Sequence, residues 1–150
     1  MPLRDKLEDD IRDSMRQRDQ ARLDALRFLK FAVQAVEKEK GETLDDLAMI
    51  EVVSRQVNDR RESIRAFEQG ARTDLAAKES GDLTVLEEYL PPQLSLGEIA
   101  DLVKAVIVDV GATDARDKGK VMGKLMPQVR GKADGAVVNQ IVTEMLESIG

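Results

Sequence analysis

The chain has 150 residues, a formal net charge of −6 and 42% hydrophobic residues, which is enough apolar content for one ordinary domain or two small ones. Cysteine and histidine are absent from the sequence, which excludes disulfides, thiolate nucleophiles, Cys/His zinc sites and imidazole acid–base catalysis. Only 3% of the residues are aromatic and none is tryptophan, so the core must be built from aliphatic side chains, as is typical of helical bundles.

Four amphipathic helices are predicted in the first part of the chain, because apolar residues recur there at the helical spacing of three to four. The first helix begins at Leu3 and ends at a polar break over residues 17–20. The second ends at Gly41, the third at Gly70 and the fourth at Leu90. Their apolar faces include Leu7, Ile11, Met15, Leu23, Leu26, Phe28, Leu29, Val33, Ile50, Val53, Val57, Ile64, Phe67, Leu75, Leu83 and Leu86.

Short polar residues indicate where two of these helices begin. Thr43, with Asp46 three residues later, approximates a capping box before the third helix. Thr73 is the expected cap of the fourth helix. Gly81 lies inside the fourth helix and is a candidate kink, because an interior glycine costs about 0.5–1 kcal/mol relative to alanine.

A domain boundary is predicted at Pro91-Pro92, which cannot continue a helix. Ser95 with Glu98 then forms a capping box that starts a new helix. The sequence therefore predicts an all-α protein with an amino-terminal helical subdomain of about four helices, residues 1–92, and a small three-helix carboxy-terminal domain, residues 93–150. The last three helices are expected near Leu96–Val110, Ala115–Met126 and Gly135–Ser148, with stops at Gly111 and Pro127 and a cap at Asp134.

The segment 112–135 is basic within an acidic chain, because it holds six basic and three acidic residues. Lys120 and Lys124 are one helical turn apart and share a face, which makes a cationic edge. An edge of lysines suits phosphate groups better than base edges. The basic residues of this segment are Arg116, Lys118, Lys120, Lys124, Arg130 and Lys132.

Gly119 and Gly123 are four residues apart in the same helix, where each costs stability, so a neighbour should need the space that a side chain would fill. Close packing on another helix of the bundle is the favoured interpretation, and contact with an RNA backbone is the alternative. Met122 and Met126 are expected in the core. Asp134 is expected to occupy the first amides of the last helix, which favours plain capping over anion binding there.

A second basic group lies in and after the third predicted helix. Acidic residues are interspersed with it, so the default interpretation is a solvated face with i,i+4 ion pairs, and RNA contact is the alternative. The residues proposed for a secondary basic patch are Arg60, Arg61, Arg65 and Arg72.

No catalytic constellation is found. Adjacent carboxylates such as Glu87 and Glu88 point about 100° apart on a helix and do not form a catalytic pair. We expect no cofactor and no metal, and an enzyme using Asp/Glu with a metal is the weakest alternative. The amino terminus has no apolar run behind its basic residues, and no segment of about 18 consecutive apolar residues occurs, so we expect a cytoplasmic protein that does not enter a membrane.

Two sequence blocks resemble the signature of the YqeY proteins. The first is Glu87-Glu88-Tyr89-Leu90-Pro91-Pro92-Gln93-Leu94-Ser95, and the second runs from Lys118-Gly119-Lys120-Val121-Met122-Gly123 to Ala133-Asp134-Gly135. A less specific similarity covers Arg60-Arg61-Glu62-Ser63-Ile64. That family is similar to the helical and tail region of the B subunit of the aspartyl/glutamyl-tRNA amidotransferase.

The resemblance implies an all-helical fold and a possible tRNA contact, because the tail of the amidotransferase B subunit contacts tRNA. A family-level label of carbon–nitrogen ligase with glutamine as amido donor would describe the relative, whose chemistry lies in a separate cradle domain that this chain has no room for. We therefore expect a non-catalytic tRNA-binding or amidotransferase-associated module. The alternative is a protein–protein adaptor that docks through the glycine- and Met-lined helix. The positions implied for tRNA contact are Lys118, Lys120, Lys124, Arg130, Lys132 and Gly135.

Overall fold

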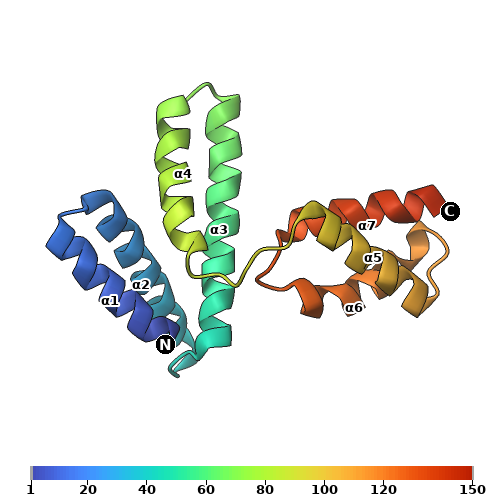
Figure 1. Ribbon diagram of the computed structural model, residues 1–150, viewed down its shortest axis with the longest axis horizontal. Coiled ribbons are helices and arrows are strands. Elements are labelled where there is room, and N and C mark those ends of the chain that lie inside the picture. Colours follow the sequence, from blue (N-terminus) through green and yellow to red (C-terminus); the bar gives the residue numbers. More distant parts are fainter. Residues whose placement is uncertain (1, 150) are drawn as a thin grey trace. The chain divides into compact units, whose positions relative to one another are not determined.

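The computed structural model describes residues 2–149, which form seven α-helices, one short 3-10 helix and no strand (Figure 1). The predicted all-α class, with four helices followed by three, is confirmed. The chain divides after Leu90 into two compact units. Each unit has its own hydrophobic core, so each is described separately.

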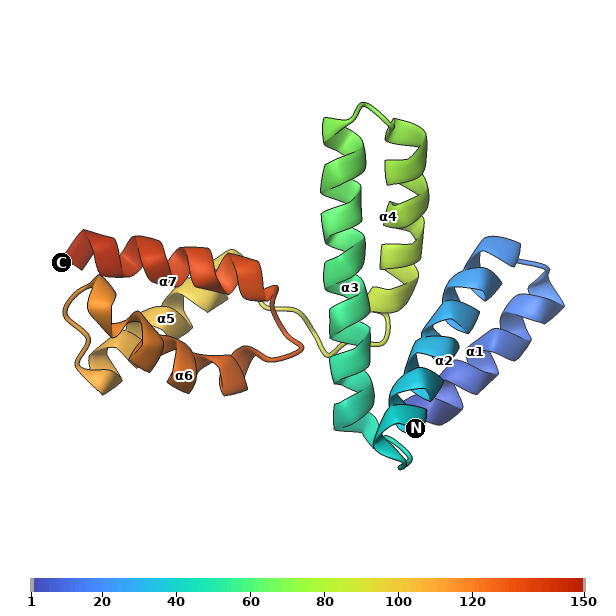
Figure 2. The same cartoon turned by 180° about the vertical axis from the view of Figure 1, so that it is seen from behind.

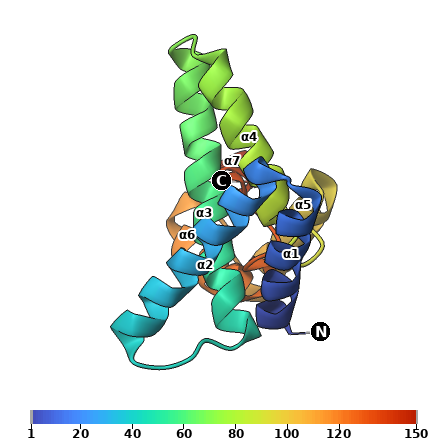
Figure 3. The ribbon, with the colours of Figure 1, turned by 90° about the vertical axis from the view of Figure 1, so that its left-hand side faces the viewer.

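Unit 1 consists of two helical hairpins. α1 (Leu3–Gln17) pairs with α2 (Gln20–Lys40), and α3 (Asp46–Gln69) pairs with α4 (Thr73–Glu87). Figures 1 and 2 show α3 and α4 side by side from opposite sides, and in the side view of Figure 3 α2 crosses α3. The shared core contains Leu7, Ile11, Leu23, Leu26, Leu29, Val33, Leu44, Met49, Val52, Val53, Val57, Leu86 and Tyr89.

The helix ends in unit 1 correct two predicted caps. Asp45, not Thr43, caps α3, because its carboxylate accepts the amide of Ala48 at 2.9 Å. The predicted cap at Thr73 is wrong, because Thr73 is the first residue of α4 and the N-cap position belongs to Arg72, which makes no side-chain cap bond. The second helix ends at Gly41 in the left-handed conformation, with φ of 71°, as predicted.

Tyr89 locks the end of α4 to α1. Its ring is 2% exposed and its hydroxyl donates to Asp10. The ammonium of Lys6 lies 3.7 Å from the centroid of the same ring. Arg22 lies 3.7 Å from Asp10 and 2.6 Å from Glu88, so it ties α2 to the same cluster. The Glu-Glu-Tyr-Leu-Pro block is thus a structural element at the close of unit 1.

Unit 2 is a three-helix bundle. Its elements are α5 (Leu96–Val110), the 3-10 turn Ala115–Asp117, α6 (Lys118–Val129) and α7 (Gly135–Ile149). The three helices contact one another and enclose a core made almost only of β-branched residues and leucine. The core residues are Ile99, Val103, Val106, Val121, Leu125, Val129, Val138, Val142 and Leu146.

The predicted capping box of α5 is confirmed, with Ser95 and Glu98 bonded reciprocally. The predicted stop at Pro127 is wrong, because α6 continues through it to Val129. The proline stands in the last turn of the helix, where loss of one amide is tolerated more easily than in the interior. Its missing amide would have donated to the carbonyl of Gly123, four residues earlier.

Candidate nucleic-acid interface

The face of α6 that points away from its core includes two glycines, Gly119 and Gly123, where no side chain covers the backbone. Val121, Leu125 and Val129 are fully buried on one side of the helix. Gly119 and Gly123 are exposed on the other side, since successive residues turn by about 100°. A Cβ atom added at either glycine would meet no atom within 4 Å. The expected close packing of these glycines on another helix of the bundle is therefore wrong.

The lysines of α6 border this glycine face on two sides. Lys120 and Lys124 are exposed and lie one turn apart on the side next to α5. Lys118 projects to the other side, where its ammonium donates to Asn139 of α7 at 2.8 Å. The structure thus brings Lys120 and Lys124 together and separates Lys118 from them by the width of the open face. Met122 and Met126 pack against the core, as predicted.

Surface carboxylates accompany these lysines. Lys124 pairs with Asp109 of α5, and the ammonium of Lys120 lies 3.8 Å from Asp117. The amide of Thr113 donates to Asp117 and lowers the pKa of that carboxyl, with a smaller contribution from the charge of Lys120. Both lysines remain at least half exposed, so these ion pairs are of the surface kind that contributes about 0–1 kcal/mol and exchanges readily.

The loop after α6 carries two further predicted residues, Arg130 and Lys132, both exposed. Hydrogen bonds to its backbone carbonyls fix its path. The backbone amide of Leu94 donates to the carbonyl of Lys132 at 2.8 Å, and the side-chain amide of Gln93 donates to the carbonyl of Gly131 at 2.9 Å. Gly131 has φ of 76°, a left-handed conformation that glycine adopts without strain. Both side chains therefore project from an anchored loop.

Gly135 begins α7, and the carboxylate of Asp134 accepts the amide of Ala136 at 3.0 Å. The expected capping role of Asp134 is confirmed. Because the carboxylate occupies the start of the helix, the amides there are not offered to an anion. Gly135 contributes space rather than a charge to the predicted edge, since a Cβ atom there would meet nothing within 4 Å.

The secondary basic patch is not one surface. Arg60 is 17% exposed and pairs with Glu79 at 2.8 Å, while its guanidinium stacks on Phe28 at 4.7 Å. Arg61 contacts Asn58, Arg65 is exposed, and Arg72 pairs with Asp74 in the turn before α4. Arg60 is thus committed to contacts within unit 1, whereas Arg65 and Arg72 face solvent.

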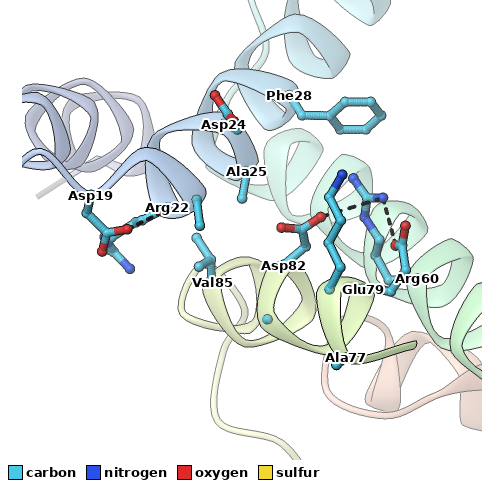
Figure 4. Close-up of a pocket in the computed structure, with 13 residues that line it drawn as sticks. Asp19, Arg22, Asp24, Ala25, Phe28, Arg60, Ala77, Glu79, Asp82 and Val85 are labelled. Carbon is cyan, nitrogen blue, oxygen red and sulfur yellow. Dashed lines mark hydrogen bonds and ion pairs between the residues drawn. The ribbon is translucent and has the colours of Figure 1, made fainter. Parts of the chain in front are cut away.

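Sequence reasoning missed a groove in unit 1. A cavity of about 670 Å³ lies between α2 and α4 over Arg60, with Phe28 in its wall (Figure 4). Phe28 was expected in the core but is 48% exposed. The signal available in the sequence is helical position, because Phe28 and Phe31 lie on the side of α2 opposite Leu26 and Leu29, and Phe31 is likewise exposed, at 63%.

Two broader properties hold for the described residues. None of the helices is long and apolar enough to cross a membrane. No group of three or more acidic side chains in residues 2–149 is arranged to hold a metal ion.

Comparison with known proteins supports the resemblance of the two sequence blocks. The model of the family described as Yqey-like protein matches residues 4–146. The chain belongs to the YqeY family. Similar curated proteins carry the name "Altered inheritance of mitochondria protein 41, mitochondrial". The protein of that name from Pyrenophora tritici-repentis is 27% identical over 94% of this chain and 79% of its own length. Those from Saccharomyces cerevisiae strain YJM789 and from Kluyveromyces lactis are 26% and 23% identical and are covered over 82% and 81% of their lengths.

These names contradict the expectation of a cytoplasmic protein, because they assign the YqeY relatives to mitochondria. The expectation rested on the lack of a recognisable targeting pattern. A targeting segment is removed from the mature protein and takes no part in the fold, so the core and composition of a folded YqeY domain do not indicate its subcellular localisation.

Proposed function

We propose that this YqeY protein, expected from its sequence to be a non-catalytic tRNA-binding or tRNA-amidotransferase-associated module, binds tRNA and contacts the phosphate backbone through α6 and the loop after it. The observation that carries the proposal is the open glycine face of α6 beside Lys120 and Lys124. Two glycines without side chains, with cations beside them, allow a polyanionic chain to approach the helix and present ammonium groups to its phosphates.

The cost of the two glycines supports an external partner. Each glycine in a helix interior costs about 0.5–1 kcal/mol relative to alanine. Nothing in the described part of unit 2 uses the space at Gly119 or Gly123, so packing within the bundle does not offset that cost. A binding partner that approaches the backbone of α6 closely would give the two glycines a function.

The distribution of charge also supports this location. Residues 1–90 hold 16 basic and 21 acidic side chains, whereas residues 91–150 hold seven basic and eight acidic ones. Most of the acidity therefore belongs to unit 1. Within unit 2 the basic side chains gather along α6 and the loop after it, so a phosphate backbone meets less repulsion there than elsewhere on the chain.

A protein adaptor that docks on the same helix is the rival function. The adaptor expected from the sequence would use Met122 and Met126 as part of its docking surface, but both methionines pack against the core of unit 2. The glycine face alone remains available to a partner helix. Such a partner would bury apolar surface, and its binding would respond weakly to salt.

Salt dependence separates these two functions. Fluorescence anisotropy of labelled tRNA should show binding that weakens linearly on a logarithmic salt scale, by about 0.7–0.9 logarithmic units for each phosphate neutralised per tenfold salt. Contacts from Lys120, Lys124, Arg130 and Lys132 correspond to a slope of about −3 to −4. Absence of tRNA binding at low salt, or a slope near zero, would overturn the proposal.

A further inference from the structure

The groove between α2 and α4 has the volume of a ligand site. Its cavity of about 670 Å³ falls within the range of about 300–1,000 Å³ in which most ligand pockets lie. The two hairpins of unit 1 diverge from each other (Figure 1), and the groove is lined by residues of both. Four of the lining residues have small side chains or none and leave the space open, namely Ala21, Ala25, Ala77 and Gly81.

Carboxylates dominate the charge of the groove. Arg22 reaches the lining, but its guanidinium is paired with Glu88 and Asp10, neither of which lines the groove. The remaining charged side chains are four carboxylates and two cations, so the groove is net negative. These side chains are Asp19, Asp24, Glu79, Asp82, Arg60 and Lys78.

Asp24 and Asp82 are the carboxylates of the groove with the weakest partners. Asp24, on α2, accepts a hydrogen bond from the neutral side-chain amide of Gln20 at 2.7 Å. Asp82, on α4, lies 3.9 Å from Arg60, whose closer partner is Glu79. Burial raises the pKa of Asp82, and the negative charges of Glu79 and Asp24 raise it further, whereas the charges of Arg60 and Lys78 lower it without cancelling the shift. A cation placed between the two helices would relieve this repulsion.

Phe28 adds an apolar and aromatic wall. Figure 4 shows its ring beside Arg60 and above the α4 residues, with Asp24 one turn away on α2. The ring is about half exposed although aromatic rings are among the side chains that gain most from burial. Long basic side chains combine an aliphatic stem, which packs on such a ring, with a charged end that reaches carboxylates.

We propose that the α2–α4 groove binds a lysine- or arginine-bearing segment of a partner protein, with the basic head between Asp24 and Asp82 and its stem on Phe28. The negative lining repels phosphate, which makes RNA the wrong class of occupant for this surface. The groove lies entirely in unit 1, so the inference is independent of the tRNA contact proposed for α6.

The probe is a fluorescent amphipathic peptide of leucine, alanine and lysine, with a matched peptide in which glutamate replaces every lysine. The full chain should bind the lysine peptide and not the glutamate peptide. Asp24→Asn/Asp82→Asn should weaken binding at least tenfold by removing both charges. Gly81→Leu should do the same by filling the groove, and it keeps the fold because leucine is a better helix former and the position opens to space.

Asp59→Asn/Glu68→Gln is the matched control, because it removes two exposed charges of α3 that do not line the groove. Its affinity should stay within twofold of wild type. The proposal is overturned if the lysine peptide does not bind, if it binds the groove variants as well as the control, or if the glutamate peptide binds equally. Loss of tRNA affinity in the groove variants would assign the groove to nucleic acid and also overturn it.

Discussion

The hydroxyl of Tyr89 donates a hydrogen bond to the carboxylate of Asp10, 79 residues earlier in the chain. This bond joins the end of α4 to α1 and lies under the ammonium of Lys6. It explains the Glu-Glu-Tyr-Leu-Pro block of the YqeY signature as a closure of unit 1 rather than as a site.

Tyr89→Phe should destabilise unit 1 by about 1–3 kcal/mol, because it keeps the ring but leaves a partly buried carboxylate short of one donor. Chemical denaturation followed by circular dichroism measures the change. Asp9→Asn is the control: Asp9 is half exposed, pairs with Arg12 at the surface, and its replacement should change stability by less than about 0.5 kcal/mol. Equal stability of Tyr89→Phe and wild type would show that the bond contributes nothing.

Alkaline titration of Tyr89 gives a second test. Burial raises the pKa of this phenol well above its usual value of about 10, and its bond to Asp10 raises it further. A raised pKa means that the stabilisation is present below about pH 10 and is lost as the pH rises toward the folded value. Tyr89 is the only tyrosine, so phenolate absorbance reports it alone. Absorbance should rise only as circular dichroism shows unfolding; a midpoint near 10 in folded protein would contradict the burial.

Acid should weaken the same cluster. Burial tends to raise the pKa of Asp10, but hydrogen bonds from Tyr89 and Lys6 and the charges of Lys6 and Arg22 outweigh it and leave the pKa lowered. The contribution of Asp10 is therefore present above about pH 4 and is lost as the pH falls through the lower folded value. The stability difference between wild type and Asp10→Asn should shrink from pH 7 to pH 3. A difference that stays constant over this range would refute the lowered pKa.

Gly123→Ala should stabilise unit 2 by about 0.5–1 kcal/mol, and Gly119→Ala, in the first turn of α6, by less, because alanine is the better helix former and its methyl group meets no neighbour. Thermal unfolding measures the gain. Gly111→Ala in the same unit is the contrasting control, since Gly111 has φ of 68° and alanine is strained there. If the alanine variants at 119 or 123 lost stability instead, the helical face would not be open.

The helical architecture follows from local signals that the sequence carries directly. The spacing of Leu7 and Ile11, the left-handed stop at Gly41 and the capping box at Ser95 are decided within a few residues, and the structure contains all three. Thr43 failed as a cap because α3 begins at Asp46, so the N-cap position belongs to Asp45, whose carboxylate accepts the amide of Ala48.

The sites depend on which helices contact one another, and local sequence patterns do not show this. Lys118 and Lys120 border opposite sides of α6 because they are two residues apart, which helical spacing predicts, but only the packing of α7 on α6 places Asn139 within reach of Lys118. Arg60 belonged to a predicted basic patch, yet the pairing of α3 with α4 turns it toward Glu79. The α2–α4 groove exists only because two hairpins diverge, and no local pattern encodes that divergence.

Charge reversal on α6 tests the central claim most directly. tRNA affinity at low salt should be compared between wild type, Lys120→Glu/Lys124→Glu and the matched control Lys38→Glu/Lys40→Glu, which reverses two exposed lysines at the end of α2. Circular dichroism first establishes that all three proteins are folded. The α6 variant should then bind tRNA at least tenfold more weakly than wild type, a larger loss than in the control, and its affinity should depend less steeply on salt. Equal losses in both variants, or none in the α6 variant, would contradict a tRNA-binding face on α6.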